Sequence, residues 1–464
     1  MIAECVPDDG ATRLRCASAW LQDGPTGPVE LTVRAGTITA IDPVLPGATT
    51  GSAPAAPVQI LPGLVLPGFA DAHSHLFHRG LRGRTHRPAA DGSGSFWTWR
   101  EAMYALAGRL EPDGLYELAV AGFSELLCAG YTAVGEFHYL HHDRSGRSYQ
   151  DPNAMGLALI AAARDVGIRL TLLDTLYLAT GFDRPGSVAA PLGAVQQRFS
   201  DGSVGAWAER IADLGTPDGV RIGAAVHSVR AVQPARLAEV AGVLGELDPG
   251  RLLHVHLSEQ RQENADALAA TGLTPTGLLA AAGLLGPATS AVHATHLDDA
   301  DLALLGGSGT TVVICPSTEA DLADGLPRIA DLVTAGVPLA CGGDQQVLVD
   351  PFHQARGIEW GERLRTGRRG TVDPGDLLTA ATVHSHRSIG SSAGVIAVGH
   401  PADLVCVRTD SARTAGSDLD QLLMAATAVD VVQVLVGGRV LARDGVHTAL
   451  GDPGPRLAVA LSGK

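Results

Sequence analysis

Short apolar runs recur through the middle of the chain and alternate with longer stretches of helical character. The apolar runs cover residues 65–73, 132–138, 168–176, 220–227, 251–257, 289–295, 310–315 and 337–341. The helical stretches between them include residues 115–130, 152–167 and 265–283. Eight buried strands joined by helices are typical of a (β/α)8 barrel, so the pattern predicts the α/β class and a TIM barrel.

Both ends of the chain carry a different pattern. Residues 29–42 alternate apolar and polar positions around a glycine turn, which predicts a β-hairpin, and residues 399–410 and 430–445 contain further short strands. Residues 43–59 are rich in Pro, Gly, Ala, Ser and Thr, which indicates a loop. We therefore expect a small β-sandwich built from both termini, with parts at residues 1–64 and 396–464 that flank a barrel at residues 65–395.

Composition and charge exclude several classes of protein. The 464 residues are 45% hydrophobic and 18% charged, which is typical of a large folded core. No apolar stretch reaches the roughly 18 residues that span a membrane. The net charge is −15 and there is no basic run, so we expect neither nucleic acid nor a membrane as a partner. The N-terminal residues lack the pattern of a secretory signal, and the six cysteines are scattered, so we expect a cytoplasmic protein with reduced thiols.

Polar side chains that can bind metals or carry protons collect where the apolar runs end. The first run ends in His73 and His75, and both rings aim at one point because residues i and i+2 of a strand face the same side. The alternative is a pair of surface histidines at a strand end. In (β/α)8 barrels, however, the active site lies at these carboxyl ends. The other ends contribute Glu136, His138, Tyr139, His227, Arg230, His254, His256, Glu259, His293, His296 and Asp344.

Three imidazoles and one carboxylate fit a mononuclear site for zinc, or for iron, with one open position for water. Such a metal lowers the pKa of its water towards 7. Glu259 follows His256 by three residues, where it could shuttle protons, and His293 could polarise the electrophile or hold the hydroxide. We expect His254 and His296 to lie behind these residues or in the core.

The HxH pair, His256 with Glu259, His293 and Asp344, together with the flanking sandwich strands, resembles the amidohydrolase superfamily over nearly the whole chain. Many binuclear members of that superfamily bridge two metals with a carboxylated lysine from the fourth strand. Lys464 is the only lysine in this chain. The resemblance therefore implies the mononuclear deaminase branch and a single divalent metal ion, zinc or iron.

Five longer stretches resemble the formimidoylglutamate deiminases, which convert N-formimidoyl-L-glutamate to N-formyl-L-glutamate and ammonia in histidine degradation. The stretches are GSFWTWREAMY (94–104), GEFHYLHHD (135–143), AAVHSVRAV (224–232), HVHLSEQ (254–260) and CPSTEADLADG (315–325). Position by position, the resemblance implies metal ligands at His73, His75, His256 and Asp344, catalytic groups at Glu259, His293 and Asp344, and substrate contacts at His78, Arg100, Tyr139, His227 and Arg230.

The charge of that substrate agrees with two of these residues. The substrate carries two carboxylates, and the arginine fork binds a carboxylate bidentately. Arg230 follows a strand end, and Arg100 follows the FWTW stretch in the long first loop. A surface arginine stacked on a neighbouring tryptophan is the alternative for Arg100.

The chain departs from the family pattern at two places. His78 stands where some members have glutamine, and both side chains can donate a hydrogen bond. Gln345 and Gln346 follow Asp344 where the family usually has a small serine and its neighbour. The second departure leaves open how the aspartate is supported, the shape of the pocket and the rate.

We predict a metal-dependent deiminase of a small dicarboxylate amidine, and a homodimer, since dimers are common among such barrels. A deaminase of another amidine, a guanidine-like compound or an aminated ring is the alternative enzyme. The two glutamines favour that alternative, and the two arginines argue against it. A non-catalytic scaffold is a third possibility, but such relatives normally lose metal ligands, and all four are present.

Overall fold

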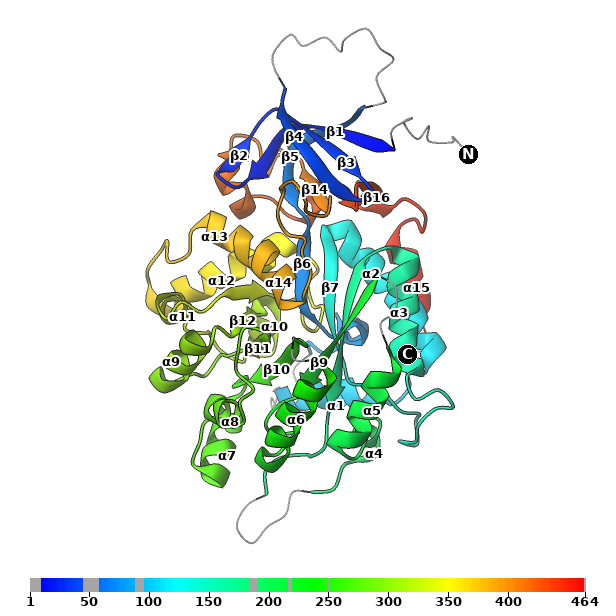
Figure 1. Ribbon diagram of the computed structural model, residues 1–464, viewed down its shortest axis with the longest axis vertical. Helices are drawn as coiled ribbons and strands as arrows, with labels where there is room; N and C mark the ends of the chain where they lie inside the picture. Colours follow the sequence, from blue (N-terminus) through cyan, green and yellow to red (C-terminus); the bar gives the residue numbers. More distant parts are fainter. Residues whose placement is uncertain are drawn as a thin grey trace.

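The computed structural model describes residues 10–44, 58–87, 96–183, 190–215, 219–248 and 250–462. These residues form a β-sheet domain at one end and a helix-covered barrel below it (Figure 1). The barrel sheet has eight strands in chain order, each parallel to its neighbours. The strands are β6 (Phe69–Ser74), β7 (Tyr131–His138), β8 (Arg169–Leu176), β9 (Val220–Val226), β10 (Leu253–Leu257), β11 (Thr289–His293), β12 (Thr311–Ile314) and β13 (Leu339–Cys341). All eight predicted runs are confirmed as strands.

The first and last strands of this sheet meet at their carboxyl ends. Ser74 and Asp344 form a parallel bridge. The N–H of Asp344 donates to the carbonyl of His73 at 2.8 Å, and the N–H of His75 donates to the carbonyl of Asp344 at 2.9 Å. The sheet therefore closes on itself, and the predicted (β/α)8 barrel is confirmed.

Helices connect the strands and cover the outside of the barrel (Figure 1). They are η1 (Leu76–Leu81), α1 (Phe96–Ala107), α2 (Pro112–Ala129), α3 (Ala154–Val166), α4 (Ala194–Gln197), α5 (Val204–Asp213), α6 (Pro234–Leu247), α7 (Arg261–Thr271), α8 (Pro275–Ala281), α9 (Asp299–Ser308), α10 (Pro316–Asp321), α11 (Ile329–Thr334), α12 (Pro351–Thr366), α13 (Pro374–Thr379), η2 (Ala380–His384) and α14 (Ser385–Ser388). Within the described ranges, none of the helices has the length and apolar character needed to cross a membrane.

The stretch predicted as helical at residues 265–283 is two helices, α7 and α8. Gly272 ends α7 with a φ of 76°. The side chain of Thr274 accepts a hydrogen bond from the N–H of Gly277 at 3.0 Å, and Pro275 begins α8. A left-handed glycine followed by a capped proline start stops one helix and begins another. Apolar spacing alone did not reveal the break, because both helices bury residues against the barrel.

The terminal domain is one sheet of nine strands in the order β17-β16-β15-β14-β5-β1-β3-β4, with β2 paired to β1. The strands are β1 (Ala11–Leu21), β2 (Gly24–Thr26), β3 (Val29–Arg34), β4 (Thr37–Pro43), β5 (Val58–Pro67), β14 (Leu404–Val407), β15 (Val431–Val436), β16 (Arg439–Arg443) and β17 (Val446–His447). Since β5 pairs with β14, both ends of the chain build this domain, as predicted. Its core includes Leu14, Leu31, Leu61, Leu404 and Leu435. Residues 45–57 of the predicted loop lie outside the described residues.

The C-terminal segment adds η3 (Leu419–Met424), η4 (Ala428–Asp430) and α15 (Pro453–Leu461), and α15 packs beside α2 (Figure 1). The run predicted at residues 65–73 belongs to both domains, because β5 ends at Pro67 and β6 begins at Phe69. A Cβ atom on Gly68 would lie 2.3 Å from Oγ1 of Thr132, so only glycine fits at this junction. The domain boundaries at residues 64/65 and 395/396 stay a prediction.

Candidate metal centre and active site

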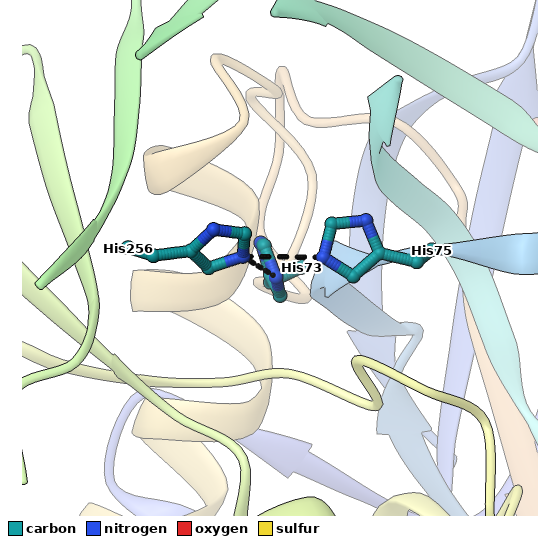
Figure 2. Close-up of side chains that lie close together, drawn as sticks. All are labelled: His73, His75 and His256. Atoms are coloured by element: carbon teal, nitrogen blue, oxygen red, sulfur yellow. Dashed lines mark hydrogen bonds between the residues drawn. The ribbon is translucent and has the colours of Figure 1, made fainter. Parts of the chain in front are cut away.

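The four side chains predicted as metal ligands meet at the carboxyl end of the barrel. Nε2 of His256, in β10, lies 3.1 Å from Nε2 of His75 and 3.1 Å from Nε2 of His73 (Figure 2). Oδ1 of Asp344, just after β13, lies 3.5 Å from Nε2 of His73 and 3.4 Å from Nε2 of His75. Three imidazole nitrogens and one carboxylate oxygen, contributed by three strand ends, therefore converge on one point.

The hydrogen bonds of two rings determine where their protons lie. Nδ1 of His75 donates to the carbonyl of Phe137 at 3.0 Å, and Nδ1 of His256 donates to the carbonyl of His227 at 2.8 Å. Because a carbonyl only accepts, each neutral ring presents an unprotonated Nε2 to the other. Two such lone pairs repel at 3.1 Å unless a cation lies between them. The donor set therefore fits a divalent metal, whose histidine ligands commonly donate their second N–H to a carbonyl.

Burial keeps these imidazoles in the form that binds metals. Burial lowers the pKa of His73 to about 3. It also lowers the pKa of His75, and it holds the pKa of His256 well below its usual value. All three rings are therefore neutral near pH 7, and a neutral imidazole can offer its lone pair without first losing a proton.

The turn that carries Asp344 is held from below by Asp71 and Gln346. Oδ1 of Asp71 accepts from the N–H of Gly343 at 2.7 Å, and Oδ2 accepts from Nε2 of Gln346 at 2.8 Å. The second amide hydrogen of Gln346 points to Oγ of Ser74 at 3.1 Å. The two glutamines that depart from the family pattern thus do different things. Gln346 connects β6 to the Asp344 turn, whereas Gln345 turns away and donates to Asp321 at 2.8 Å.

His293 and Glu259 lie beside the ligand cluster. Nε2 of His293 is 3.7 Å from Oδ2 of Asp344 and 3.9 Å from Oε1 of Glu259. Nδ1 of His293 faces Oε1 of Glu319 at 3.4 Å. Burial opposes protonation of His293, but the carboxylates of Glu259, Glu319 and Asp344 raise its pKa to about 10. His293 is thus oriented as a hydrogen-bond donor towards the space between Asp344 and Glu259.

A pocket opens beside this cluster and brings the predicted substrate contacts together. Nε2 of His78 lies 2.8 Å from the hydroxyl of Tyr139. His227 closes the floor, and its ring centroid lies 5.1 Å from that of His256. His78, Arg100, Tyr139, His227 and Arg230 all line the pocket, together with His75, His256, Glu259, His293 and Asp344.

The two arginines are held in different ways. Nη2 of Arg230 lies 3.9 Å from Oε2 of Glu259, and its Nε lies 3.8 Å from Oε1 of Glu263. These distances are too long for hydrogen bonds, and Nε of Arg230 is buried without a hydrogen-bond partner among the described residues. The guanidinium carbon of Arg100 lies 4.4 Å from the ring centroid of Trp97. Arg100 is therefore both stacked on a tryptophan and part of the pocket wall, and its contact with the substrate stays a prediction.

Other histidines at the strand ends lie elsewhere. Nε2 of His254 bonds to the carbonyl of Ser388 at 2.9 Å, and Nε2 of His296 bonds to the carbonyl of Asp324 at 2.8 Å. Neither residue lines the pocket, as expected. Glu136 is also structural, since it accepts from Oγ of Ser74 at 2.7 Å and from the N–H of Leu76 at 2.8 Å.

The loop after β7 is tied down by its own histidines and by Arg198. The N–H groups of His141 and His142 both donate to the carbonyl of Arg198 at 3.0 Å. Nε2 of His141 bonds to the carbonyl of Thr175 at 2.9 Å. Arg198 is fully buried and donates back to the carbonyl of His142 at 2.9 Å. These contacts support the segment that carries Tyr139.

Several further residues belong to the site although no role was predicted for them from the sequence. Tyr177 follows β8 and lines the pocket, and Glu319 in α10 contacts His293. Tyr177 and Glu319 follow the third and seventh strands, at whose ends no catalytic or binding residue was predicted. Glu263 lies behind Arg230. Their signal was position alone, because each follows a predicted strand end by no more than a few residues.

The comparison with known sequences agrees with this geometry. The profile of the Amidohydrolase family matches residues 64–441. The chain belongs to the amidohydrolase family. It is 37% identical over 401 residues to a formimidoylglutamate deiminase of Pseudomonas aeruginosa, with 83% of this chain and 86% of that protein covered.

Two further relatives show the breadth of this family. The chain is 30% identical over 400 residues to an 8-oxoguanine deaminase of Pseudomonas aeruginosa, covering 83% of this chain and 84% of that protein. A crystal structure of an amidohydrolase from Brucella melitensis superposes with a TM-score of 0.85 at 29% sequence identity, covering 97% of this chain and 99% of that chain. The barrel and the terminal sheet domain are thus shared with a solved member of the family.

Proposed function

We propose that this amidohydrolase is a metal-dependent deiminase that hydrolyses N-formimidoyl-L-glutamate to N-formyl-L-glutamate and ammonia. The identity to the Pseudomonas aeruginosa deiminase supports the substrate. The observation that carries the proposal is the position of Glu259. Its carboxylate lies 3.9 Å from Nε2 of His293 on one side and 3.9 Å from Nη2 of Arg230 on the other. One pocket thus contains both groups suited to hydrolysis, Glu259 and His293, and an arginine that can bind a substrate carboxylate.

His73, His75, His256 and Asp344 are the residues that would hold the metal. Histidine nitrogens with one carboxylate suit zinc, or iron, and we propose zinc. When bound, the metal supplies a Lewis acid that makes a water molecule acidic enough to ionise near pH 7. Every other part of the reaction falls to the side chains around it.

The protein side chains carry the protons of the reaction. Glu259 accepts one proton of the attacking water as its oxygen bonds to the formimidoyl carbon, and Asp344 then accepts the other proton from the resulting hydroxyl. Nε2 of His293 faces both carboxylates and donates a hydrogen bond to the charge that develops at this centre. Glu259 gives the first proton to the terminal nitrogen, which becomes an amine, and then passes on the second proton from Asp344. The C–N bond to that nitrogen breaks as the carbonyl forms, ammonia leaves and the formyl group remains on the glutamate nitrogen.

Two arginines of the pocket select for a dicarboxylate substrate. Arg230 has a buried Nε without a hydrogen-bond partner among the described residues, so it can donate to a substrate carboxylate without breaking an internal bond. Arg100, in α1, binds the second carboxylate. His78 and Tyr139 share a hydrogen bond at 2.8 Å, so one of the two has a hydrogen left to donate to the substrate, and His227 lines the pocket beside them.

Ammonia release tests the proposal directly. Purified protein loaded with zinc is incubated with N-formimidoyl-L-glutamate and, in parallel, with guanidines, other amidines and aminated rings that include 8-oxoguanine. We expect ammonia and N-formyl-L-glutamate in equal amounts, with kcat/KM highest for the dicarboxylate amidine. A preference for a ring substrate would replace the proposal with the alternative deaminase. Turnover of no compound by protein that binds one metal would favour a scaffold.

A further inference from the structure

Tyr177 lies at the end of β8, a strand to which no substrate contact has been given. Its side chain is 7% exposed and lines the same pocket as Arg230. The ring centroid of Tyr177 lies 4.9 Å from that of His227 and 5.6 Å from that of Phe199. Aromatic packing therefore fixes the phenol in the wall of the pocket, close enough to Arg230 for the two groups to interact electrostatically.

The direction of one hydrogen bond shows that the hydroxyl hydrogen of Tyr177 is available to a further partner. Nε2 of Gln196, in α4, lies 2.8 Å from the hydroxyl oxygen of Tyr177. The orientation of the Gln196 amide follows from its other end, because Oε1 accepts from the N–H of Gly193 at 3.0 Å. The nitrogen must then face Tyr177, and an amide nitrogen only donates. Tyr177 is thus the acceptor of this bond, and its own hydrogen remains for another partner.

Tyr104 lines the same pocket, and burial raises the pKa of its phenol. Neither Tyr104 nor any other phenol offers the hydrogen of Tyr177 a charged acceptor. A hydroxyl oxygen is a weaker acceptor than a carboxylate, and hydrogen bonds to a carboxylate are shorter and stronger. A carboxylate held by Arg230 would therefore be the stronger acceptor for the hydrogen of Tyr177.

We propose that Tyr177 is a further substrate-binding residue, whose hydroxyl donates to the carboxylate gripped by Arg230, and that Gln196 is the positioning residue that keeps this hydrogen directed into the pocket. This inference rests on the proposed function, because it requires a carboxylate-bearing ligand. It adds a donor from β8 to the contacts that the family resemblance implies. No charge is added to the pocket, since the phenol is neutral.

Tyr177→Phe tests the proposal, because it removes one oxygen and keeps the ring that packs on His227 and Phe199. The KM for N-formimidoyl-L-glutamate and the Kd for N-formyl-L-glutamate, measured by titration calorimetry, should each rise about 10-fold, as expected for a hydrogen bond to a charged group. The kcat should stay within about 3-fold. Tyr116→Phe is the control, since its hydroxyl contacts Asp165 outside the pocket and its loss should change neither constant.

Two monocarboxylate analogues identify the carboxylate that Tyr177 contacts. N-formimidoylglycine keeps only the carboxylate next to the amidine, and N-formimidoyl-4-aminobutyrate keeps only the distal one. One analogue should lose affinity in the Tyr177→Phe variant as the dicarboxylate does, and the other should be unaffected. Equal effects on both analogues, or on neither, would contradict a specific bond.

A double-mutant cycle tests the role of Gln196. Gln196→Met should raise KM by less than Tyr177→Phe does, because the phenol remains but loses its orientation. In the Tyr177→Phe background the same substitution should add little, since no hydroxyl is left to orient. An undiminished effect there would show that Gln196 acts on the pocket in another way. Metal content and thermal midpoint are measured for each variant, and both should match wild type.

The outcomes separate this inference from the proposed function. If wild-type protein with one metal neither releases ammonia from N-formimidoyl-L-glutamate nor binds its product, the proposed function is wrong and the role of Tyr177 falls with it. If the wild type is active and Tyr177→Phe keeps KM and Kd within about 2-fold, only the role of Tyr177 is wrong.

Discussion

The main chain of Asp344 is hydrogen-bonded to the main chain of His73, with the N–H of Asp344 donating to the carbonyl of His73 at 2.8 Å. This bond joins the last barrel strand to the first. It also joins two candidate ligands of one metal through their backbones, so barrel closure and ligand geometry depend on the same contact. Any side chain that supports this junction should therefore influence metal binding without touching the metal.

Gln346→Met should weaken metal binding, and Gln345→Met should not. Gln346 holds Asp71 beneath the Asp344 turn at 2.8 Å, whereas the side chain of Gln345 donates to Asp321. Loss of a residue that supports the ligands typically costs about 10–100-fold in metal affinity. Competition with a chelator of known affinity measures the zinc Kd of both variants. Equal affinities would show that Asp71 needs no support from Gln346.

One equivalent of metal should copurify with the protein, and His256→Ala should remove both the metal and turnover. Nε2 of His256 is 3.1 Å from both other imidazole nitrogens, so its loss opens the centre of the ligand set. Chelation of the wild type should lower the thermal midpoint, because a ligand that binds only the folded state stabilises it by mass action. Elemental analysis gives the stoichiometry. Two tightly bound equivalents at full activity would contradict a mononuclear site.

Much of this site could be predicted because, in a (β/α)8 barrel, the place of a residue at a strand end determines that it lies at the rim of the barrel. Each strand end reaches the same rim, so His73, His256 and Asp344 could be grouped although they are far apart in the chain. The period of two along β6 then explained why His73 and His75 point together. The expected positions of His254 and His296 away from the pocket also agree with the structure.

The remaining residues depend on packing that no periodicity expresses. Tyr177 follows an apolar strand and looks like one more core residue until the direction of the Gln196 amide is known. Glu319 enters the site because α10 begins directly after β12 and turns it back towards His293. In the sequence, Gln346 left open how Asp344 is supported. In the structure, its side chain contacts Asp71 and Ser74 and so supports the turn that carries Asp344. The sequence gives the residue types, but the direction of a hydrogen bond follows only from the positions of the atoms.

Glu259→Gln should separate catalysis from metal binding. The substitution keeps the size of the side chain and its hydrogen bonding but removes the proton that Glu259 carries. Burial raises the pKa of this carboxyl above its ordinary value, in the direction that helps it to hold a proton. Metal content should persist while kcat falls about 10²–10⁴-fold. A variant with near-normal kcat would remove Glu259 from the mechanism.

Arg230→Met should chiefly weaken selection for the dicarboxylate. Truncating one partner of a buried charge pair costs roughly 2–5 kcal/mol, so kcat/KM for N-formimidoyl-L-glutamate should fall about 30-fold or more. An analogue without the matching carboxylate should lose far less, since Arg230 has nothing to bind in it. A general folding defect would lower both substrates equally, so the ratio of the two kcat/KM values is the measurement that decides.

The structure adds a necessary control to that experiment. Nε of Arg230 lies 3.8 Å from the buried carboxylate of Glu263, so Arg230→Met leaves Glu263 without its cation. Burial raises the pKa of Glu263 to about 7, and loss of the arginine would raise it further, because that charge now lowers it. The double variant Arg230→Met, Glu263→Gln removes the unpaired charge. It should regain thermal stability but not selection for the dicarboxylate. If selection returned with stability, the effect of Arg230 would lie in folding rather than in contact with the substrate.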